Sequence, residues 1–327
     1  MTASDPSAPT RVHEHEADLI VEKADKVAED VVALTLTDLN GGELPEWTPG
    51  AHVDLVLNPE LTRQYSLCGD VTNARQWRVA VLRTSDSRGG SQLVHDSLTA
   101  GAAVRVRGPR NHFPLVSSPR YLFIAGGIGI TPLLPMIREA ATRGAVWQLA
   151  YGGRRRATMA FIDELADHGE RVQLAAQDEA GPLDLAALLA EPRDDTAVYC
   201  CGPEGLLTAV EKACKTWPTG ALHIERFAAK AQPIGQVAER AFEIILQRSG
   251  LTLEVPADKS IFDTVQAAGV SVLGSCFEGV CGTCETGVLD GQIDHRDSIL
   301  TEEERESNDF MMICVSRCRS ARLTLDL

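Results

Sequence analysis

The sequence lacks three features, and each absence excludes a class of protein. No apolar run approaches the roughly 18 residues of a membrane-spanning helix, so we expect no membrane partner. The polar N-terminus lacks the basic and apolar regions of a signal peptide, which predicts a disordered tail over residues 1–13 and a cytoplasmic location. Positive charge is scarce, because 31 Lys and Arg face 46 Asp and Glu. The resulting net charge of −15 argues against nucleic acid as a partner.

The chain has nine cysteines, and three of them fall within one nine-residue segment. Cys276, Cys281 and Cys284 form a C-x4-C-x2-C run, and Cys314 completes a set of four. This is the plant-type spacing for a 2Fe–2S cluster held by four thiolates. A structural zinc site usually has two short cysteine pairs, and the second pair is missing here. A disulfide framework is the other alternative. Such frameworks are typical of secreted proteins, and the sequence lacks a secretory signal.

Residues 14–115 are rich in β-forming stretches separated by Gly, Pro, Asn and Asp. Short strands at such spacing predict a small antiparallel barrel. Arg63, Tyr65 and Ser66 lie along one strand of it, which could offer a phosphate ligand and backbone N–H groups to a flat heterocycle. Residues 87–91 place two glycines and a serine before a helical stretch, where they could cradle an anion. Barrel wall and turn are the plain alternatives for these two segments. The expected strands are 31–36, 52–57, 77–82 and 103–106.

From residue 116 to 228 the pattern alternates between strand and helix, which predicts a doubly wound α/β domain. Ligands of such sheets bind at the carboxyl ends of the strands, where the Gly126–Gly129 loop and Cys201-Gly202-Pro203 both fall. A glycine-rich loop beneath a helix brings backbone close to a pyrophosphate. The expected strands are 121–125, 146–151, 172–176, 197–201 and 222–224. A first helix is expected after the glycine-rich loop and ends near residue 142, and three more are expected at 159–168, 183–190 and 203–217.

Three consecutive arginines, Arg154 to Arg156, follow the second of these strands. They could contact the adenosine end of a dinucleotide, and they could accept a 2′-phosphate, which leaves NADPH open beside NADH. A solvated basic turn is the alternative. Asp178 follows the third strand and could contact the ribose or the adenine of the dinucleotide.

After a linker over residues 229–240, residues 241–327 predict a small sheet crossed by one helix. Strands are expected at 241–246, 251–255 and 323–325, with a hairpin turn at 249–250 and a helix that Ser260 caps. Residues 237–327 hold 16 acidic and 8 basic side chains, a net charge of −8. The acidic surface, which includes the run at 302–306, could steer a basic partner or could simply be solvated.

Taken together, Arg63-Gln64-Tyr65-Ser66, Gly89-Gly90-Ser91, the 126–132 loop, Cys201-Gly202-Pro203 and the four cysteines resemble the phthalate dioxygenase reductase family. The resemblance covers residues 14–327. It implies an antiparallel β-barrel flavin domain, a doubly wound α/β nicotinamide domain and a β-grasp ferredoxin domain, with FMN rather than FAD.

The resemblance also implies roles for particular residues. Ser66 would lie near the flavin N5 and Cys201 near the nicotinamide, where both would tune hydride transfer. Phe227 would cover the flavin, and Cys276, Cys281, Cys284 and Cys314 would bind the cluster, although the nearby Cys318 competes for the fourth place. The other expected FMN contacts are Arg63, Gln64, Tyr65, Val81, Leu82, Arg83, Gly89, Gly90 and Ser91, and the expected dinucleotide contacts are Gly127, Ile128, Gly129, Thr131, Arg154, Gly202 and Pro203.

The function that the resemblance implies is an NAD(P)H-dependent reductase. It would take electrons in pairs and pass them singly, through FMN and a 2Fe–2S cluster, to a terminal oxygenase. A Rieske-type aromatic oxygenase or O-demethylase is the expected partner, and a bacterial cytochrome P450 is the alternative. A non-catalytic binding module with a structural zinc is a third interpretation, which an absorption spectrum would separate from the other two.

Overall fold

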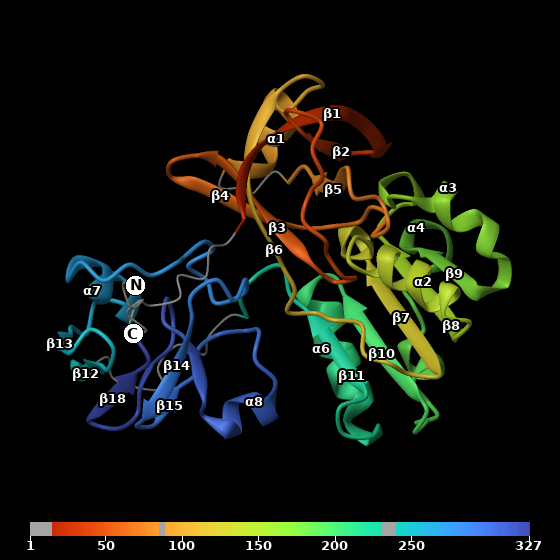
Figure 1. Ribbon diagram of the computed structural model, residues 1–327. Coiled ribbons are helices and arrows are strands. Elements are labelled where there is room, and N and C mark those ends of the chain that lie inside the picture. The colour runs from red at the N-terminus through yellow and green to blue at the C-terminus, as the bar shows by residue number, and fades with distance from the viewer. Residues whose placement is uncertain (1–14, 85–88, 231–239) are drawn as a thin grey trace, which may run out of the picture.

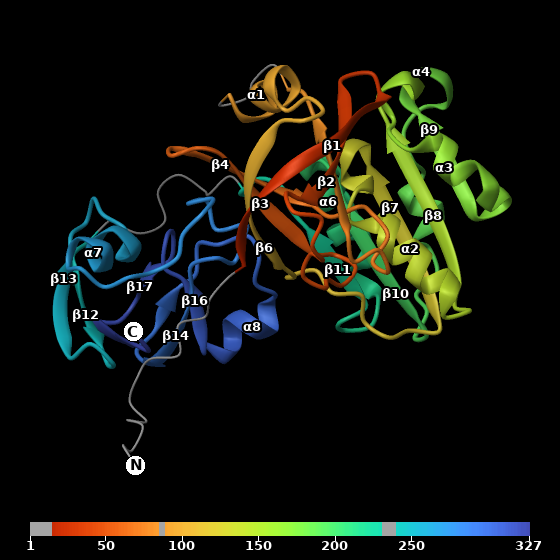
Figure 2. The ribbon, with the colours of Figure 1, turned by 45° about the horizontal axis from the view of Figure 1, so that its top comes forward.

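The computed structural model describes residues 15–84, 89–230 and 240–327, so the expected tail and most of the expected linker lie outside the described residues. The described chain forms three sheet-based regions that follow one another along the sequence (Figure 1). Turning the molecule shows the first region between the other two (Figure 2). No helix in these three ranges has the length and apolar character needed to cross a bilayer.

The first region is a six-stranded antiparallel sheet with strand order β4-β3-β6-β1-β2-β5. A bridge between Leu67 and Val79 connects its two edge strands, so the sheet closes into the barrel that the sequence predicts. Inward-facing side chains such as Leu19, Leu36 and Trp77 are fully buried and fill the barrel. The elements are β1 (Glu16–Ala28), β2 (Val31–Asp38), β3 (His52–Asn58), β4 (Leu61–Ser66), β5 (Gln76–Leu82), α1 (Gly90–Ser97) and β6 (Ala103–Arg110).

The second region is a parallel sheet of five strands in the order β11-β10-β7-β8-β9. Its central strands are apolar along their length, as a sheet covered on both faces requires. The doubly wound prediction is confirmed. The strands are β7 (Arg120–Gly126), β8 (Val146–Gly153), β9 (Val172–Ala176), β10 (Thr196–Cys201) and β11 (Leu222–Glu225), and the longer helices are α2 (Leu133–Thr142) and α6 (Glu204–Ala213).

Three predicted helices of this region are wrong in extent. The stretch 159–168 is broken, because Phe161 has a φ of +63° and only α3 (Ile162–Leu165) follows before a 3-10 turn. The stretch 183–190 forms only the single turn α5 (Leu185–Leu188), which Asp184 caps. The stretch 203–217 ends its α-helix at Ala213 and continues as a 3-10 turn. In each case tertiary packing overrides a helical pattern that is weak at its ends.

The third region is a sheet in the order β13-β12-β18-β14-β16, crossed by α7 (Ile261–Ala267). The first and last strands of this region pair in parallel, which is the β-grasp arrangement that was expected. Ser260 caps α7 through the Asp263 N–H, as predicted. The strands are β12 (Phe242–Leu246), β13 (Leu251–Val255), β14 (Glu285–Asp290), β16 (Phe310–Met312) and β18 (Arg322–Leu325), with a small ribbon of β15 (Ile293–Asp294) and β17 (Arg317–Cys318).

The acidic run 302–306 was expected only as charged surface, and it forms the helix α8 (Glu302–Ser307). Thr301 and Glu304 make a full capping box at its start, with the Glu304 carboxylate accepting the Thr301 N–H at 2.7 Å. The T-x-x-E pattern was therefore a helix signal in the sequence that the charge run concealed.

Candidate functional site

A cavity of about 1070 Å³ lies between the barrel and the α/β domain. Its walls come from the carboxyl ends of parallel strands, from the end of β5 and from the segment after β11. It brings together nine of the expected contacts, namely Leu82, Arg83, Gly127, Ile128, Gly129, Arg154, Gly202, Pro203 and Phe227. Thr131 lies buried beneath this wall and donates to the Ile128 carbonyl, and Val81 points into the barrel core instead. The volume is ample for a nicotinamide dinucleotide segment and a flavin edge.

The glycines of the 126–129 loop are needed for close packing between two strand ends. A Cβ at Gly129 would lie 2.2 Å from the Cys201 carbonyl oxygen, and a Cβ at Gly126 would lie 2.6 Å from the Pro203 ring. Gly127 has a φ of +53° with open space around it. Backbone from two strands therefore meets at the cavity without intervening side chains, which suits a pyrophosphate bound through N–H groups.

The barrel strand β4 contacts the start of α1. A Cβ at Gly90 would lie 2.7 Å from Cγ of Arg63, so the arginine stem crosses directly over the glycine. Gly89 has a φ of +88°, and the Ser91 hydroxyl accepts the Thr84 N–H at 3.2 Å. An arginine, a glycine turn and a serine at a helix start form an anion cradle, so these residues fit the phosphate of a flavin mononucleotide.

Ser66 and Cys201, the two residues expected to tune hydride transfer, meet at a third residue. The Ser66 hydroxyl donates to Oε2 of Glu225 at 3.5 Å, and the Cys201 thiol lies 4.0 Å from the same oxygen. Burial raises the pKa of the Glu225 carboxyl to about 8, and the Ser66 hydrogen bond opposes that rise. Burial also raises the pKa of the Cys201 thiol, so it stays protonated. Glu225 carried no signal in the sequence, because a glutamate at a strand end is ordinarily solvated.

The Glu225→Gln variant tests this environment. Because the folded-state pKa is raised, the wild-type carboxyl contributes stability at low pH that is lost as pH rises from about 4.5 to about 8. Each unit in that window lowers the free energy of unfolding by at most about 1.4 kcal/mol. The amide cannot ionise, so we expect Glu225→Gln to remove this slope and to be more stable than the wild type at pH 8. Urea unfolding of the intact chain at pH 5, 6, 7 and 8 measures the slope; parallel curves for the two proteins would contradict the assignment.

The four expected cluster ligands lie together on one side of the ferredoxin domain. The side chains of Cys276, Cys281, Cys284 and Cys314 lie close enough to influence one another's pKa, with Cys276 beside Cys281 and Cys314, and Cys284 beside Cys314. Cys318 is separate, since its thiol contacts the Ser320 carbonyl and hydroxyl at 3.2 Å. In the described ranges, no group of three or more His, Cys, Asp or Glu is arranged around a single metal ion. Four neighbouring thiolates are the ligand set of a two-iron cluster, which spreads them over two metals, so these residues fit the cluster.

Hydrogen-bond donors and tight turns support the cluster loop. The Glu278 N–H donates to the Cys276 sulfur at 3.4 Å, and the Thr283 hydroxyl lies 3.1 Å from the Cys281 sulfur. Gly279 and Gly282 have φ of +69° and +71°, as the expected bend requires. Donors around cluster sulfurs stabilise negative charge and tune the reduction potential.

The barrel contacts the cluster loop through a small polar network. Asp54 is fully buried and accepts hydrogen bonds from the Ser275 hydroxyl at 2.6 Å and the Gln64 amide at 2.9 Å. Arg110 pairs with the same carboxylate. A Cβ at Gly282 would overlap the His112 ring, which packs against the other side of the loop. The Gln64 side chain, an expected FMN contact, connects the barrel to Ser275, next to the expected ligand Cys276.

Removing the Ser275 hydroxyl should loosen this contact. Ser275→Ala leaves part of the Asp54 carboxylate unsatisfied, which costs about 1–3 kcal/mol of docking free energy. We expect faster amide hydrogen exchange across residues 274–284 and across β4. Ser271→Ala, at an exposed position of the same segment, is the matched control and should change neither region. Unchanged exchange in both variants would show that the network does not hold the two domains together.

The barrel, the α/β domain with its glycine-lined cavity and the cysteine loop define an iron–sulfur oxidoreductase of the flavin- and nicotinamide-binding class. Residues 244–319 match the family described as "2Fe-2S iron-sulfur cluster binding domain". The chain is 45% identical over 302 residues to phenoxybenzoate dioxygenase subunit beta of Ectopseudomonas oleovorans, covering 92% of this chain and 94% of that one. It is 40% identical to vanillate O-demethylase oxidoreductase of Pseudomonas sp., covering 95% and 99% of the two chains.

Solved structures agree with these relatives. The phthalate dioxygenase reductase structure matches with a TM-score of 0.69 and 36% identity over 95% of this chain and 98% of that one. An intact self-sufficient cytochrome P450 monooxygenase matches with a TM-score of 0.90 and 43% identity. The match covers 95% of this chain but only 41% of the P450 chain. The protein belongs to the phthalate dioxygenase reductase family.

Proposed function

We propose that this protein is the reductase component of an oxygenase system, passing electrons from NADH through FMN and a 2Fe–2S cluster to a Rieske-type aromatic oxygenase or O-demethylase. The observation that carries the proposal is the sequence of contacts from the glycine-lined cavity, across the barrel, to the cluster loop at Ser275. Bound flavin accepts a hydride and releases electrons one at a time, which is the chemistry that such a component needs. The named relatives serve dioxygenase and O-demethylase systems, and they support this class of partner.

The chain's own residues bind and orient the groups. Backbone N–H groups of the 126–129 loop hold the dinucleotide, and Ser66, Cys201 and Glu225 form the polar floor where the nicotinamide and flavin rings would meet. Phe227, which is 45% exposed at the cavity, is placed to shield that floor from water. Positioning rather than acid–base chemistry provides the rate enhancement.

FMN is favoured over FAD because the Arg63–Gly90–Ser91 cradle offers one phosphate position beside the barrel. NADH is favoured over NADPH because Arg155, which lines the cavity together with Arg154, is already paired with Glu29 at 2.8 Å. A cytoplasmic location is proposed because a chain with nine cysteines, four of them spaced for an iron–sulfur cluster, suits a reducing compartment.

A cytochrome P450 remains the second candidate partner, because the P450 monooxygenase structure contains a region similar to nearly all of this chain. Reconstitution tests both candidates. The purified reductase and NADH are mixed with the terminal components of phenoxybenzoate dioxygenase, vanillate O-demethylase and a P450, and product is measured. We expect turnover with a Rieske component and none with the P450. Product only with the P450 would reverse the order of the two candidates, and product with none of the three would reject the proposal for these partner classes.

A further inference from the structure

A hollow of about 540 Å³ opens on the ferredoxin domain beside the cluster ligand Cys314. Cys276 and Cys314 are half-buried, whereas Cys281 and Cys284 are buried, and Cys314 is the ligand that lines this hollow. The Phe262 N–H donates to the Ile313 carbonyl at 3.0 Å and ties the start of α7 to the Cys314 segment. The lining residues all belong to the third region: Ala257, Asp258, Lys259, Ser260, Arg296, Cys314, Val315 and Arg317.

The hollow lies apart from the contacts that the barrel makes with the cluster loop. The barrel reaches the loop through Gln64 and Asp54 at Ser275, next to Cys276, and through His112 at Gly282. Within the described ranges, no barrel residue lines the hollow. The cluster loop thus has one side that faces the barrel and another that opens, at Cys314, on a surface of its own.

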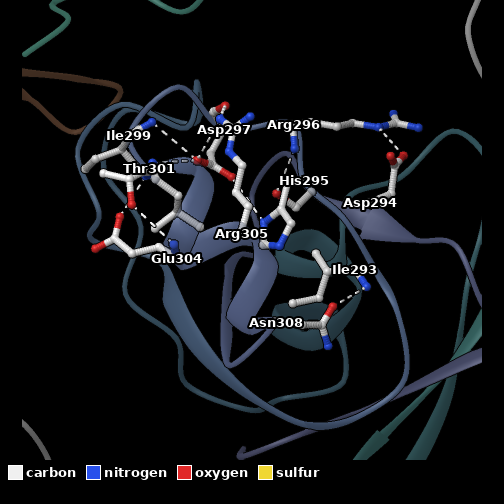
Figure 3. A network of polar contacts seen from close by, with 12 residues as sticks. Ile293, Asp294, His295, Arg296, Asp297, Ile299, Thr301, Glu304, Arg305 and Asn308 are labelled. Atoms are coloured by element: carbon white, nitrogen blue, oxygen red, sulfur yellow. Dashed lines mark hydrogen bonds and ion pairs between the residues drawn. The ribbon is translucent and has the colours of Figure 1, made fainter. Parts of the chain in front are cut away.

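The hollow is basic on an acidic domain. Lys259 is exposed at its rim and is the only lysine in the sequence after residue 230. Arg317 donates to the carbonyls of Lys259, Arg240 and Pro256, which fixes a buried guanidinium in the wall. Arg296 pairs with Asp294 at 2.9 Å and is partly exposed (Figure 3). Asp258 is the one carboxylate that lines the hollow.

The acidic helix α8 lies elsewhere. Burial and the Arg110 charge lower the pKa of the His112 imidazole, and the Glu304 carboxylate opposes this lowering, so the start of α8 lies near the barrel. Both ribbon views place α8 at the edge of the third region that lies toward the other two regions, and α7 at the opposite edge (Figures 1 and 2). A basic partner attracted by the net charge of −8 would therefore not find that charge at the Cys314 opening.

We propose that the hollow beside Cys314 is the docking site for the terminal oxygenase, and that it receives a carboxylate-bearing segment of that partner against Lys259 and Arg296. This proposal rests on the proposed function and deepens it by naming the surface. Each docking event moves one electron from the reduced cluster to the metal centre of the oxygenase, and no atom or proton moves with it. Close approach to a half-buried ligand shortens the distance that the electron travels, and complementary charge fixes the orientation.

A zero-length carbodiimide crosslink tests the contact directly. The reagent removes water between an amine and a carboxylate, so an amide bond between Lys259 and the partner forms only where the two groups touch. The probe is the Rieske terminal component that turns over in the reconstitution above, and peptide mass spectrometry locates the bond. We expect Lys259 to be the main crosslinked lysine of the reductase.

Three variants separate the effect of the Lys259 charge on binding from the ability of its amine to form the crosslink. Lys259→Arg keeps the charge, so binding should be retained and the crosslink lost. Lys259→Glu should raise the Kd for the oxygenase about tenfold and make binding less sensitive to salt. Arg248→Glu, at the opposite end of β12, is the control with the same charge change and should bind like the wild type. Reduction of ferricyanide and of cytochrome c should be unchanged in all three.

The outcomes distinguish the two proposals. Wild-type turnover with a crosslink at another lysine, or equal Kd values for Lys259→Glu and wild type, would overturn the docking site and leave the proposed function standing. Failure of the wild type to reduce any oxygenase would reject the function itself.

Discussion

Cys281→Ser is expected to abolish the broad visible absorption of the iron–sulfur cluster while the flavin bands remain. Cys281 is buried, and its thiol contacts Cys276 and the Thr283 hydroxyl, so no neighbouring group can replace it as a ligand. A serine hydroxyl is a much poorer ligand than a thiolate for iron in such clusters. The rate of electron transfer to a one-electron protein acceptor should fall at least about a hundredfold. Reduction of the flavin by NADH would remain, but the cluster that would pass electrons to the acceptor would be lost. NADH-dependent ferricyanide reduction at the flavin should be retained. Absorption spectra and the two acceptor assays on the same preparation measure both effects.

The same experiment decides between Cys314 and Cys318 as the fourth ligand. Cys314 lies beside Cys276 and Cys284, whereas the Cys318 thiol, in the ribbon β15–β17, contacts Ser320. Cys314→Ser should therefore lose the cluster and Cys318→Ser should keep it. The opposite pattern would show that Cys318, and not Cys314, is the fourth ligand.

Gly129→Ala should be the most damaging single change outside the cluster loop. Its Cβ would lie 2.2 Å from the Cys201 carbonyl oxygen and 2.7 Å from the Gly202 nitrogen, and both of these are backbone atoms that cannot rotate away. The strand ends must separate, which costs about 1–3 kcal/mol or more and widens the dinucleotide cradle. We expect the KM for NADH to rise at least about tenfold and Tm to fall by several degrees. Steady-state kinetics and thermal unfolding measure the two effects.

Gly205→Ala is the matched control for this change. Gly205 lies in α6 at the edge of the same cavity, and a Cβ there would meet nothing within 4 Å. Alanine in a helix is favoured over glycine by about 1 kcal/mol, so this variant should be neutral or slightly more stable. An equal rise in KM and an equal fall in Tm in both variants would show that any added methyl group at the cavity edge has this effect, and that the contact with Cys201 is not its cause.

The fold and the binding loops could be predicted from the sequence because their signals are local. Cysteine spacing, apolar strands and a glycine-rich strand-to-helix loop each depend on a few neighbouring residues. The helix at 159–168 was overextended because the backbone turn at Phe161, with its φ of +63°, has no sequence signal in a bulky residue.

Contacts between domains could not be predicted in this way. Burial raises the pKa of Glu225, whose hydrogen-bond partner Ser66 lies 159 positions earlier, and Ser275 gains its partner Asp54 from the barrel, 221 positions earlier. Gln64 was assigned to the flavin by its motif, and its amide reaches Ser275. Such residues are ordinary in sequence and acquire their roles only when the three regions pack together.

Anaerobic titration with NADH tests the central claim most directly, because it counts the electrons that the chain can hold. A flavin that stores two electrons and a cluster that stores one should together consume about 1.5 equivalents of NADH per protein, with loss of both the flavin and the cluster absorption. A titration that ends at about one equivalent with the cluster absorption intact would contradict the proposed transfer of electrons from the cavity to the cysteine loop.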